Sequence, residues 1–398
     1  MNADHSDHVG PSLVCPQCGH PARYAGRRRK TVTSVLGPLG FDRAYYHCAA
    51  CDVGWCPRDH ALGVTNTTLS PAVTRMIGVV GAMVSFVEGH ALLRDLAGVP
   101  VDAKQVERTA ETLGRAIAAD EQAVVAPAAP SAPTMYLGMD GTGLPMRAAD
   151  LLGRAGKQPD GSAKTREVKL VTVWTAERHD AEGVAVRDPG SVTYSAAIES
   201  AATLDTDAVR APFAQRVDRE AQRRGFDQAP RRVVLGDGAA WIWNLADDFF
   251  PGAIQIVDLF HAKQHLSDVA KAIYGAGTDL AHQWARLRHD DLDAGRVRTL
   301  CHALRQHAHP EARRCREYVT HHRARMRYPT FRAQGLCVSS GVVEAGCKVA
   351  IGTRLKRTGM HWTVAGADAI IALRCCTLSG RFEDFWERRS PTVRTEAA

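Results

Sequence analysis

Residues 232–274 read RVVLGDGAAWIWNLADDFFPGAIQIVDLFHAKQHLSDVAKAIY, and this stretch decides the fold class of the chain. An apolar run ends at Asp237, an amphipathic, helix-like segment follows, and a second apolar run ends at Asp258, with His261 three residues later. The pattern predicts a strand–helix–strand unit with an acidic residue at the end of each strand. Ligand sites in open α/β sheets gather at the carboxyl ends of strands, where acidic side chains can hold metal ions. The same signal recurs upstream, where an apolar run leads to Asp140.

The positive charge of the chain is concentrated in one block. The 398 residues are enough for two or three domains and include 50 Lys and Arg against 43 Asp and Glu. Residues 281–332 hold twelve arginines, no lysine and five acidic residues, so this block alone carries the net charge of +7. Because arginine forks match phosphate geometry, the block favours a polyanionic partner, with nucleic acid as the leading candidate.

Cysteine usage and hydropathy indicate a cytoplasmic protein rather than a secreted or membrane protein. Four of the 11 cysteines form two Cys-x-x-Cys pairs, and the chain shows no secretory leader. The longest apolar run, residues 76–87, falls short of the roughly 18 residues of a membrane span. We therefore expect no membrane segment.

Residues 1–66 are expected to form a small β module of the zinc-ribbon type. Each Cys-x-x-Cys turn offers two sulfurs to one ion, and the two turns flank a segment with β-type residues and glycine turns. A set of buried, reduced cysteines is the alternative, and Cys56 and His60 are spare ligands. The basic run at 27–30 is either a solvated loop or a phosphate contact. The predicted ligands of a structural Zn²⁺ are Cys15, Cys18, Cys48 and Cys51.

Residues 67–123 have the three- and four-residue apolar spacing of helices. A break at Gly98, with Asp102 as an N-cap, outlines a helix-turn-helix whose second helix would present Lys104 and Arg108 to DNA. A plain helical hairpin used for packing or dimerisation fits equally well, because the second helix also carries acidic residues. Residues 124–133, VVAPAAPSAP, are a Pro/Ala linker and the clearest domain boundary.

An α/β core is expected after this linker. Three successive strands, a helix and the strand–helix–strand unit give the order βββαβαβ, which is that of a ribonuclease H-like sheet. In that sheet the first and fourth strands are neighbours. A helical, arginine-rich insertion then interrupts the core. The expected strands are 135–146, 167–177 and 191–198, the helix is 206–224, and the parts are 134–279 (core), 280–334 (insertion) and 335–398 (C-terminal helices of the core).

Three acidic side chains are expected to meet in this core. Asp140 on the first strand and Asp237 on the fourth would converge, and Glu344 would arrive on a helix after the insertion. Two divalent ions, Mg²⁺ or Mn²⁺, held about 4 Å apart by such acids activate the attacking oxygen and stabilise the leaving oxygen in phosphodiester chemistry. The alternatives are ordinary Asp-Gly turns and a first-turn glutamate that favours the helix dipole.

Five stretches of the chain carry a resemblance to a known family. They are GMDGTGLP from residue 138, LGDGAAWIWN from 235, VDLFHA from 257, SSGVVEAGCK from 339 and SGRFEDFW from 379. In this order they resemble bacterial insertion-sequence transposases of the Kra type, which are DDE enzymes related to the Mutator-like group. The resemblance covers nearly the whole chain. It implies a ribonuclease H-like core with an all-helical insertion, and Asp140, Asp237 and Glu344 as the acidic triad.

The same resemblance implies supporting residues. Asp258 and His261 match an Asp/Cys-x-x-His signature, and Trp284 in the insertion matches a tryptophan used near flipped or hairpinned DNA. The alternatives are a neutral core histidine bonded to the backbone and a core tryptophan. Independently of the family, basic and aromatic residues that suit a phosphate strand and a stacked base follow the third acid, although a salt-bridged helix end would look similar. They are Arg354, Lys356, Arg357 and Trp362.

These observations predict a transposase that hydrolyses phosphodiester bonds at the ends of its element and joins the freed 3′ hydroxyl to target DNA. Its partner would be double-stranded DNA, which implies nucleoid association, and holding both element ends implies at least a homodimer. The rival enzyme is a ribonuclease H-like nuclease without strand transfer. The rival without activity is a zinc-ribbon DNA-binding protein derived from a transposase.

Overall fold

The structure is a computed structural model that describes residues 5–123, 128, 130–156, 158, 161–181, 183–202, 209–339 and 341–389. The chain divides into two compact units. The first holds the residues up to Asp120 together with those from Gly380 onward, and the second runs from Glu121 to Ser379. Half of the predicted linker at 124–133, namely residues 124–127 and 129, lies outside the described residues. Among the helices that the structure describes, none combines the length and apolar character needed to span a bilayer.

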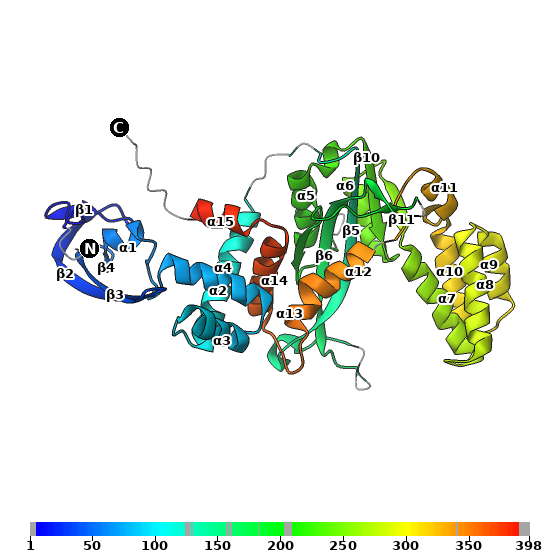
Figure 1. The fold of residues 1–398 in the computed structure, drawn as a ribbon, viewed down its shortest axis with the longest axis horizontal. Coiled ribbons are helices and arrows are strands. Elements are labelled where there is room, and N and C mark those ends of the chain that lie inside the picture. The colour runs from blue at the N-terminus through cyan, green and yellow to red at the C-terminus, as the bar shows by residue number, and fades with distance from the viewer. Residues whose placement is uncertain are drawn as a thin grey trace. The chain divides into compact units, whose positions relative to one another are not determined.

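A four-stranded antiparallel sheet opens the first unit (Figure 1). Its long central hairpin turns at Gly37, which has φ +94°, a conformation that favours glycine. The basic run at 27–30 lies inside a strand of this hairpin and pairs with residues 41–44, so the loop alternative is wrong. The strands, in sheet order, are β1 (Ser12–Val14), β2 (Pro21–Ser34), β3 (Gly37–Cys48) and β4 (Val53–Trp55).

The helices of the first unit begin and end at the residues that the sequence marks. Ser85 and Glu88 form a capping box at the start of α3, and Gly98 ends that helix in the left-handed conformation. The Asp102 carboxylate accepts a hydrogen bond from the Gln105 N–H at 2.7 Å, which confirms the predicted N-cap. The helices are α1 (Pro57–Ala61), α2 (Pro71–Met83), α3 (Phe86–Ala97), α4 (Ala103–Glu121), which runs to the first residue of the second unit, and α15 (Phe382–Arg389).

The second unit is built on a mixed five-stranded sheet with the order β11-β10-β5-β6-β9. Strands β5, β6 and β9 are antiparallel neighbours, whereas β10 runs parallel to both β5 and β11. The predicted strands and their neighbours are therefore confirmed. The sheet strands are β5 (Thr134–Pro145), β6 (Thr165–Thr175), β9 (Thr193–Ala197), β10 (Arg231–Gly236) and β11 (Ile254–Val257), and a separate hairpin joins β7 (Arg178–His179) to β8 (Ala185–Val186).

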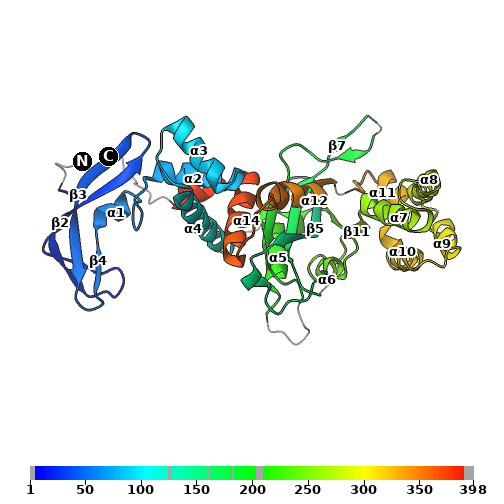
Figure 2. The same cartoon turned by 90° about the horizontal axis from the view of Figure 1, so that it is seen from below.

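Helices cover both faces of this sheet. In Figure 2, α5 and α6 lie on one side of the strands and α12 and α14 on the other. Trp174 and Tyr136 stack in the core with ring centres 5.5 Å apart, and both are fully buried. The covering elements are α5 (Pro212–Arg224), α6 (Ala240–Phe249), α12 (Gly341–Gly346), the π-helical turn η4 (Cys347–Gly352), α13 (Thr353–Leu355) and α14 (Val364–Leu378).

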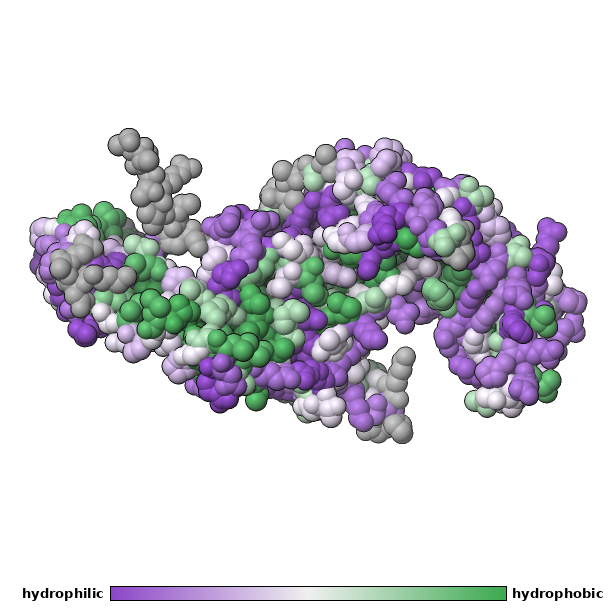
Figure 3. Space-filling view, in the orientation of Figure 1, coloured by the Kyte–Doolittle hydropathy of each residue, from purple (hydrophilic) through white to green (hydrophobic). Residues whose placement is uncertain are grey.

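A group of helices separates β11 from α12, at the place predicted for the insertion. Its packed face joins the core of the second unit through Leu300, Val319 and Tyr328. Its exposed face in Figure 3 is mainly hydrophilic, as expected from the arginine content. The helices are α7 (Leu259–Tyr274), α8 (Asp279–Asp293), α9 (Val297–Arg305), α10 (Pro310–His321) and α11 (Tyr328–Ala333).

Candidate functional site

Asp140 lies on β5 with its carboxylate held in place. The Gly141 N–H donates a hydrogen bond to it at 2.6 Å, and the buried Cys347 thiol of η4 hydrogen-bonds it as well. Burial raises the pKa of Asp140, and the nearby negative charge of Asp237 raises it further. Burial also raises the pKa of Cys347, so this group remains a thiol that can donate to the carboxylate. A divalent cation would relieve this destabilisation of the Asp140 charge.

Asp237 follows β10 at the level of Asp140. Leu235 of β10 pairs with Gly138 of β5 in parallel register. Asp237 and Asp140 each lie two residues after these paired positions, so they are at the same level of the sheet. The Asp237 carboxylate accepts a hydrogen bond from the Ala239 N–H at 2.8 Å, which closes a tight turn before α6. The predicted neighbourhood of the two acids is thus observed in the sheet register.

The insertion contacts the turn that carries Asp237. The Tyr318 hydroxyl of α10 donates a hydrogen bond to the Asp237 main-chain carbonyl at 2.8 Å, and His322, one helical turn later, hydrogen-bonds the Gly238 backbone. Gly238 has φ +108°, and a Cβ there would lie 2.5 Å from the Tyr318 ring. Glycine is required at this position both for the backbone conformation and for the approach of the ring.

Glu344 reaches the same region from α12, after the insertion. This helix packs closely on the sheet because each side of the contact has a glycine where a side chain would clash. A Cβ at Gly138 would lie 2.1 Å from the Val343 side chain, and a Cβ at Gly346 would lie 2.9 Å from Leu170. The side chain of Glu344 itself is exposed to solvent. The helix thus folds back onto β5, as the sequence required of the third acid.

Asp258 and His261 lie at the start of α7. The Asp258 carboxylate is buried and caps the helix by accepting hydrogen bonds from the N–H groups of Phe260 (2.6 Å) and His261 (3.1 Å). The His261 ring is exposed, so the alternative of a core histidine is wrong. Asp258 therefore orients the helix that presents His261 to the acids.

These side chains surround one cavity of about 590 Å³. The carboxylates of Asp140, Asp237 and Glu344 are not all within 4.8 Å of one another. Such hard oxygen donors suit Mg²⁺ or Mn²⁺ better than softer metals. The cavity is lined by Met139, Asp140, Gly236, Asp237, Asp258, Phe260, His261, Lys263, Gln264, Ser267, His289, Val343 and Glu344.

The four predicted cysteines of the first unit form a second site. Their sulfur atoms all lie within 4.8 Å of one another, with Cys15 Sγ 3.7 Å from Cys51 Sγ and Cys18 Sγ 3.5 Å from Cys48 Sγ. The Gln17 N–H, which points at the sulfur, lowers the pKa of Cys15 to about 7. This group could bind a metal ion such as zinc. Cys56 lies outside it, with its sulfur 2.9 Å from Arg43 Nη1.

Two residues predicted to contact DNA have structural roles instead. Arg354 is fully buried, with its guanidinium 5.5 Å from the Trp362 ring centre, and the Trp362 indole donates to the Leu355 carbonyl at 2.9 Å. A buried guanidinium and indole cannot reach a phosphate or a base, so the prediction for these two residues is wrong. Lys356 and Arg357 are exposed, and Lys356 hydrogen-bonds Thr142, two residues beyond Asp140 on β5.

The other predicted DNA contacts fall in different settings. Trp284 is half-buried in the insertion and packs against Tyr274 and His307, which fits the core alternative. On α4, Lys104 pairs with Glu107 at 2.7 Å, whereas Arg108 is exposed.

Comparison with solved structures gives a distant likeness. No family model and no curated protein matches the chain. A solved structure of the Drosophila P element transposase strand transfer complex aligns with 12% identity, covers 84% of this chain and 84% of that chain, and has a TM-score of 0.28.

Proposed function

We propose that the chain is a DDE transposase of the insertion-sequence type, which cuts phosphodiester bonds at the ends of its element and joins the freed 3′ hydroxyl to target DNA. One observation carries the proposal. Asp140, Asp237 and Glu344 come from distant parts of the sequence and line a single cavity. Isolated turn-forming or helix-capping acids have no reason to share a cavity, whereas the acids of a metal-dependent phosphoryl transferase must do so.

The arrangement of the sheet supports this function. Its order, with β5 between β6 and β10 and with β10 parallel to β5, agrees with the order expected of a ribonuclease H-like sheet. The level register places Asp140, within β5, beside Asp237, just after the carboxyl end of β10, at the point where the pairing of the two strands ends. The carboxyl ends of strands are where open α/β sheets bind ligands.

Some residues of the cavity would bind metal ions, and others would bind the substrate. Asp140, Asp237 and Glu344 would hold Mg²⁺ or Mn²⁺, and the metal would supply Lewis acidity to the attacking and leaving oxygens. The hydrogen bonds from Gly141 and Ala239 fix the two aspartates before substrate arrives, which lowers the cost of ordering the site.

Basic groups near the acids would hold the phosphate. His261 and Lys263 line the cavity on α7, and Lys356 reaches Thr142 beside Asp140. A phosphodiester between these cations and the metal-holding acids would have its negative charge compensated while the 3′ hydroxyl or water attacks in line. No covalent enzyme–DNA intermediate is needed. Double-stranded DNA, held by at least a homodimer, would be the partner.

The test uses duplex DNA that carries the repeats flanking the gene. Asp237→Asn, Asp140→Asn and Glu344→Gln should each lower Mg²⁺-dependent cleavage and joining by roughly 100-fold or more. Asp248→Asn, an exposed aspartate on α6, is the matched control and should cleave like the native chain. Full cleavage by Asp237→Asn would show that the triad is wrongly assigned.

The same assay separates the rival functions. A ribonuclease H-like nuclease would cleave without joining the 3′ end to a target duplex, and a silent DNA-binding protein would bind without cleaving. Inverted repeats on both sides of the gene would favour the transposase over both rivals.

A further inference from the structure

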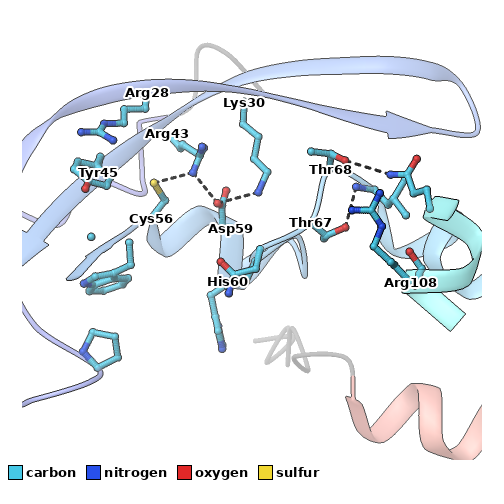
Figure 4. Close-up of a pocket in the computed structure, with 18 of the residues that line it drawn as sticks. Arg28, Lys30, Arg43, Tyr45, Cys56, Asp59, His60, Thr67, Thr68 and Arg108 are labelled. Atoms are coloured by element: carbon cyan, nitrogen blue, oxygen red, sulfur yellow. Dashed lines mark hydrogen bonds and ion pairs between the residues drawn. The ribbon is translucent and has the colours of Figure 1, made fainter. Parts of the chain in front are cut away.

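A groove of about 820 Å³ lies within the first unit, between the β2–β3 hairpin and the start of α4 (Figure 4). It is separate from the acid cavity and from the four-cysteine site. Basic side chains enter it from both sides, with Arg28, Lys30 and Arg43 on the hairpin and Arg108 on the helix. The hydroxyls of Thr67 and Thr68 face it from the loop before α2.

The groove has an excess of positive charge. Asp59 is buried and accepts hydrogen bonds from both Lys30 Nζ (3.1 Å) and Arg43 Nη1 (2.6 Å), so these three groups together keep one positive charge. The only other carboxylate among the residues lining the groove, Asp102, caps α4. Within the described part of the chain, neither Arg28 nor Arg108 has a carboxylate at ion-pair distance. Both guanidinium groups are thus available to an anion.

Arg28 is held in a fixed position. Its guanidinium carbon lies 3.4 Å from the centre of the Tyr45 ring, a stacked arrangement that leaves the N–H edges of the fork open. The Tyr45 ring in turn lies over Gly54, where a Cβ would be 1.9 Å from the tyrosine hydroxyl. A side chain at position 54 would therefore displace the ring that supports Arg28.

We infer that this groove binds the sugar–phosphate backbone of duplex DNA. Arginine forks, such as Arg28 held on the Tyr45 ring and the exposed Arg108, together with threonine hydroxyls are the donors that proteins use for phosphate oxygens. Cations on both walls suit a ligand whose charge extends along the groove, as in a nucleic-acid strand, rather than a single anionic group. The inference deepens the proposed function, because the joining reaction needs a surface outside the catalytic cavity that holds the element end.

The inference also changes how α4 is used. A recognition helix would present both Lys104 and Arg108 to the DNA. Here Arg108 lines the groove, whereas Lys104 lies outside its lining and is paired with Glu107. The helix would therefore contact the backbone beside the ribbon-like sheet instead of reading bases with its whole exposed face.

The test measures equilibrium binding of the full chain to a fluorescein-labelled mixed-sequence duplex over a series of salt concentrations, without added Mg²⁺. Arg28→Ala and Arg108→Ala should each weaken binding roughly fivefold and make the slope of log K against log salt shallower by about 0.9. Arg29→Ala on the same strand and Arg115→Ala on the same helix are matched controls outside the groove. Zinc content and thermal unfolding confirm that each variant is folded.

Two results would overturn the inference. In the first, the groove variants bind duplex like Arg29→Ala and Arg115→Ala. In the second, an oligoglutamate peptide binds as tightly as the duplex and is the only ligand that the groove variants lose. The assay measures binding and not cleavage, so the two hypotheses are tested separately. A chain that binds through the groove but never cleaves would refute only the proposed function. Normal duplex binding by the groove variants would refute only this inference.

Discussion

The Tyr318 hydroxyl donates a 2.8 Å hydrogen bond to the main-chain carbonyl of Asp237. This contact joins the helical insertion to the turn that carries the second acid of the cavity. Burial raises the pKa of Tyr318, so the phenol stays protonated and remains a donor. His322 binds the next residue of the turn, Gly238, from the same face of the helix. The insertion therefore supports the turn that carries Asp237 and also provides a basic surface.

Tyr318→Phe should loosen that turn and leave its shape largely intact. The ring still packs, but the Asp237 carbonyl loses its donor, which should cost about 1 kcal/mol of unfolding free energy. We expect the cleavage rate to fall and its Mg²⁺ requirement to rise, with no change in duplex affinity. Cleavage measured over a series of Mg²⁺ concentrations checks this.

Tyr274→Phe is the matched control for this change. Tyr274 lies in the same group of helices, and its hydroxyl is 3.5 Å from the His307 ring, away from the acids. It should leave the Mg²⁺ dependence unchanged. An equal effect of the two variants would mean that Tyr318 only stabilises the insertion.

Gly138→Ala should push α12 away from the sheet. The new Cβ would lie 2.1 Å from the Val343 side chain, so the helix that carries Glu344 must shift or the core must rearrange. Overpacking of this kind costs roughly 1–3 kcal/mol, and activity should fall further than stability alone explains. Unfolding free energy and cleavage rate are both measured.

Val343→Ala supplies the second half of that experiment. Alone it removes buried methyl groups and should destabilise the unit, but together with Gly138→Ala it removes the clash. The double variant should be more stable than the sum of the single effects allows. Simple additivity would show that α12 does not press on β5 at this point.

The strand order could be predicted from the sequence because its signals are local. Apolar runs that end in Asp140 and Asp237 mark two strands, and the element order βββαβαβ of a ribonuclease H-like sheet makes these two strands neighbours, as observed. The same holds for the cysteine pairs, whose short turns direct four sulfurs to one point. These features depend on spacing within a few residues.

The rest of the site depends on contacts between distant residues, which spacing does not reveal. Arg354 and Trp362 follow the pattern of a DNA-binding segment, yet they are buried against each other. Tyr318 and Cys347 carry no motif, and only the folded chain brings them to Asp237 and Asp140. Gly238 permits the close approach of Tyr318 because it has φ +108°. In the sequence, however, this glycine looks like part of an ordinary Asp-Gly turn.

Removal of a cysteine ligand should unfold the sheet of the first unit. Cys18→Ser should lower bound zinc from about one equivalent to near zero, because a structural tetrahedral site needs four ligands and its binding energy supports the fold. Cys301→Ser, a thiol of α9 outside the cluster, is the control and should keep the metal. Zinc content and hydrogen exchange in β2 and β3 are the readouts. A native chain without zinc, still protected in these strands, would contradict the prediction.

Mild acid should weaken the contact between α10 and the Asp237 turn. Burial lowers the pKa of His322 from 6.5 to about 4. Between these two pH values the histidine is protonated in the unfolded chain but stays neutral in the folded chain. The stabilisation is therefore complete above pH 6.5 and is lost as the pH falls toward about 4, by an amount on the order of 1–2 kcal/mol.

His265 and His289 have pKa values lowered by burial too and act in the same direction, so the native chain must be compared with His322→Gln. The difference in unfolding free energy between the two, read from hydrogen exchange in β10, should shrink with falling pH. A difference that stays constant across this range would mean that His322 has the same pKa in the folded and the unfolded chain, which would contradict the prediction.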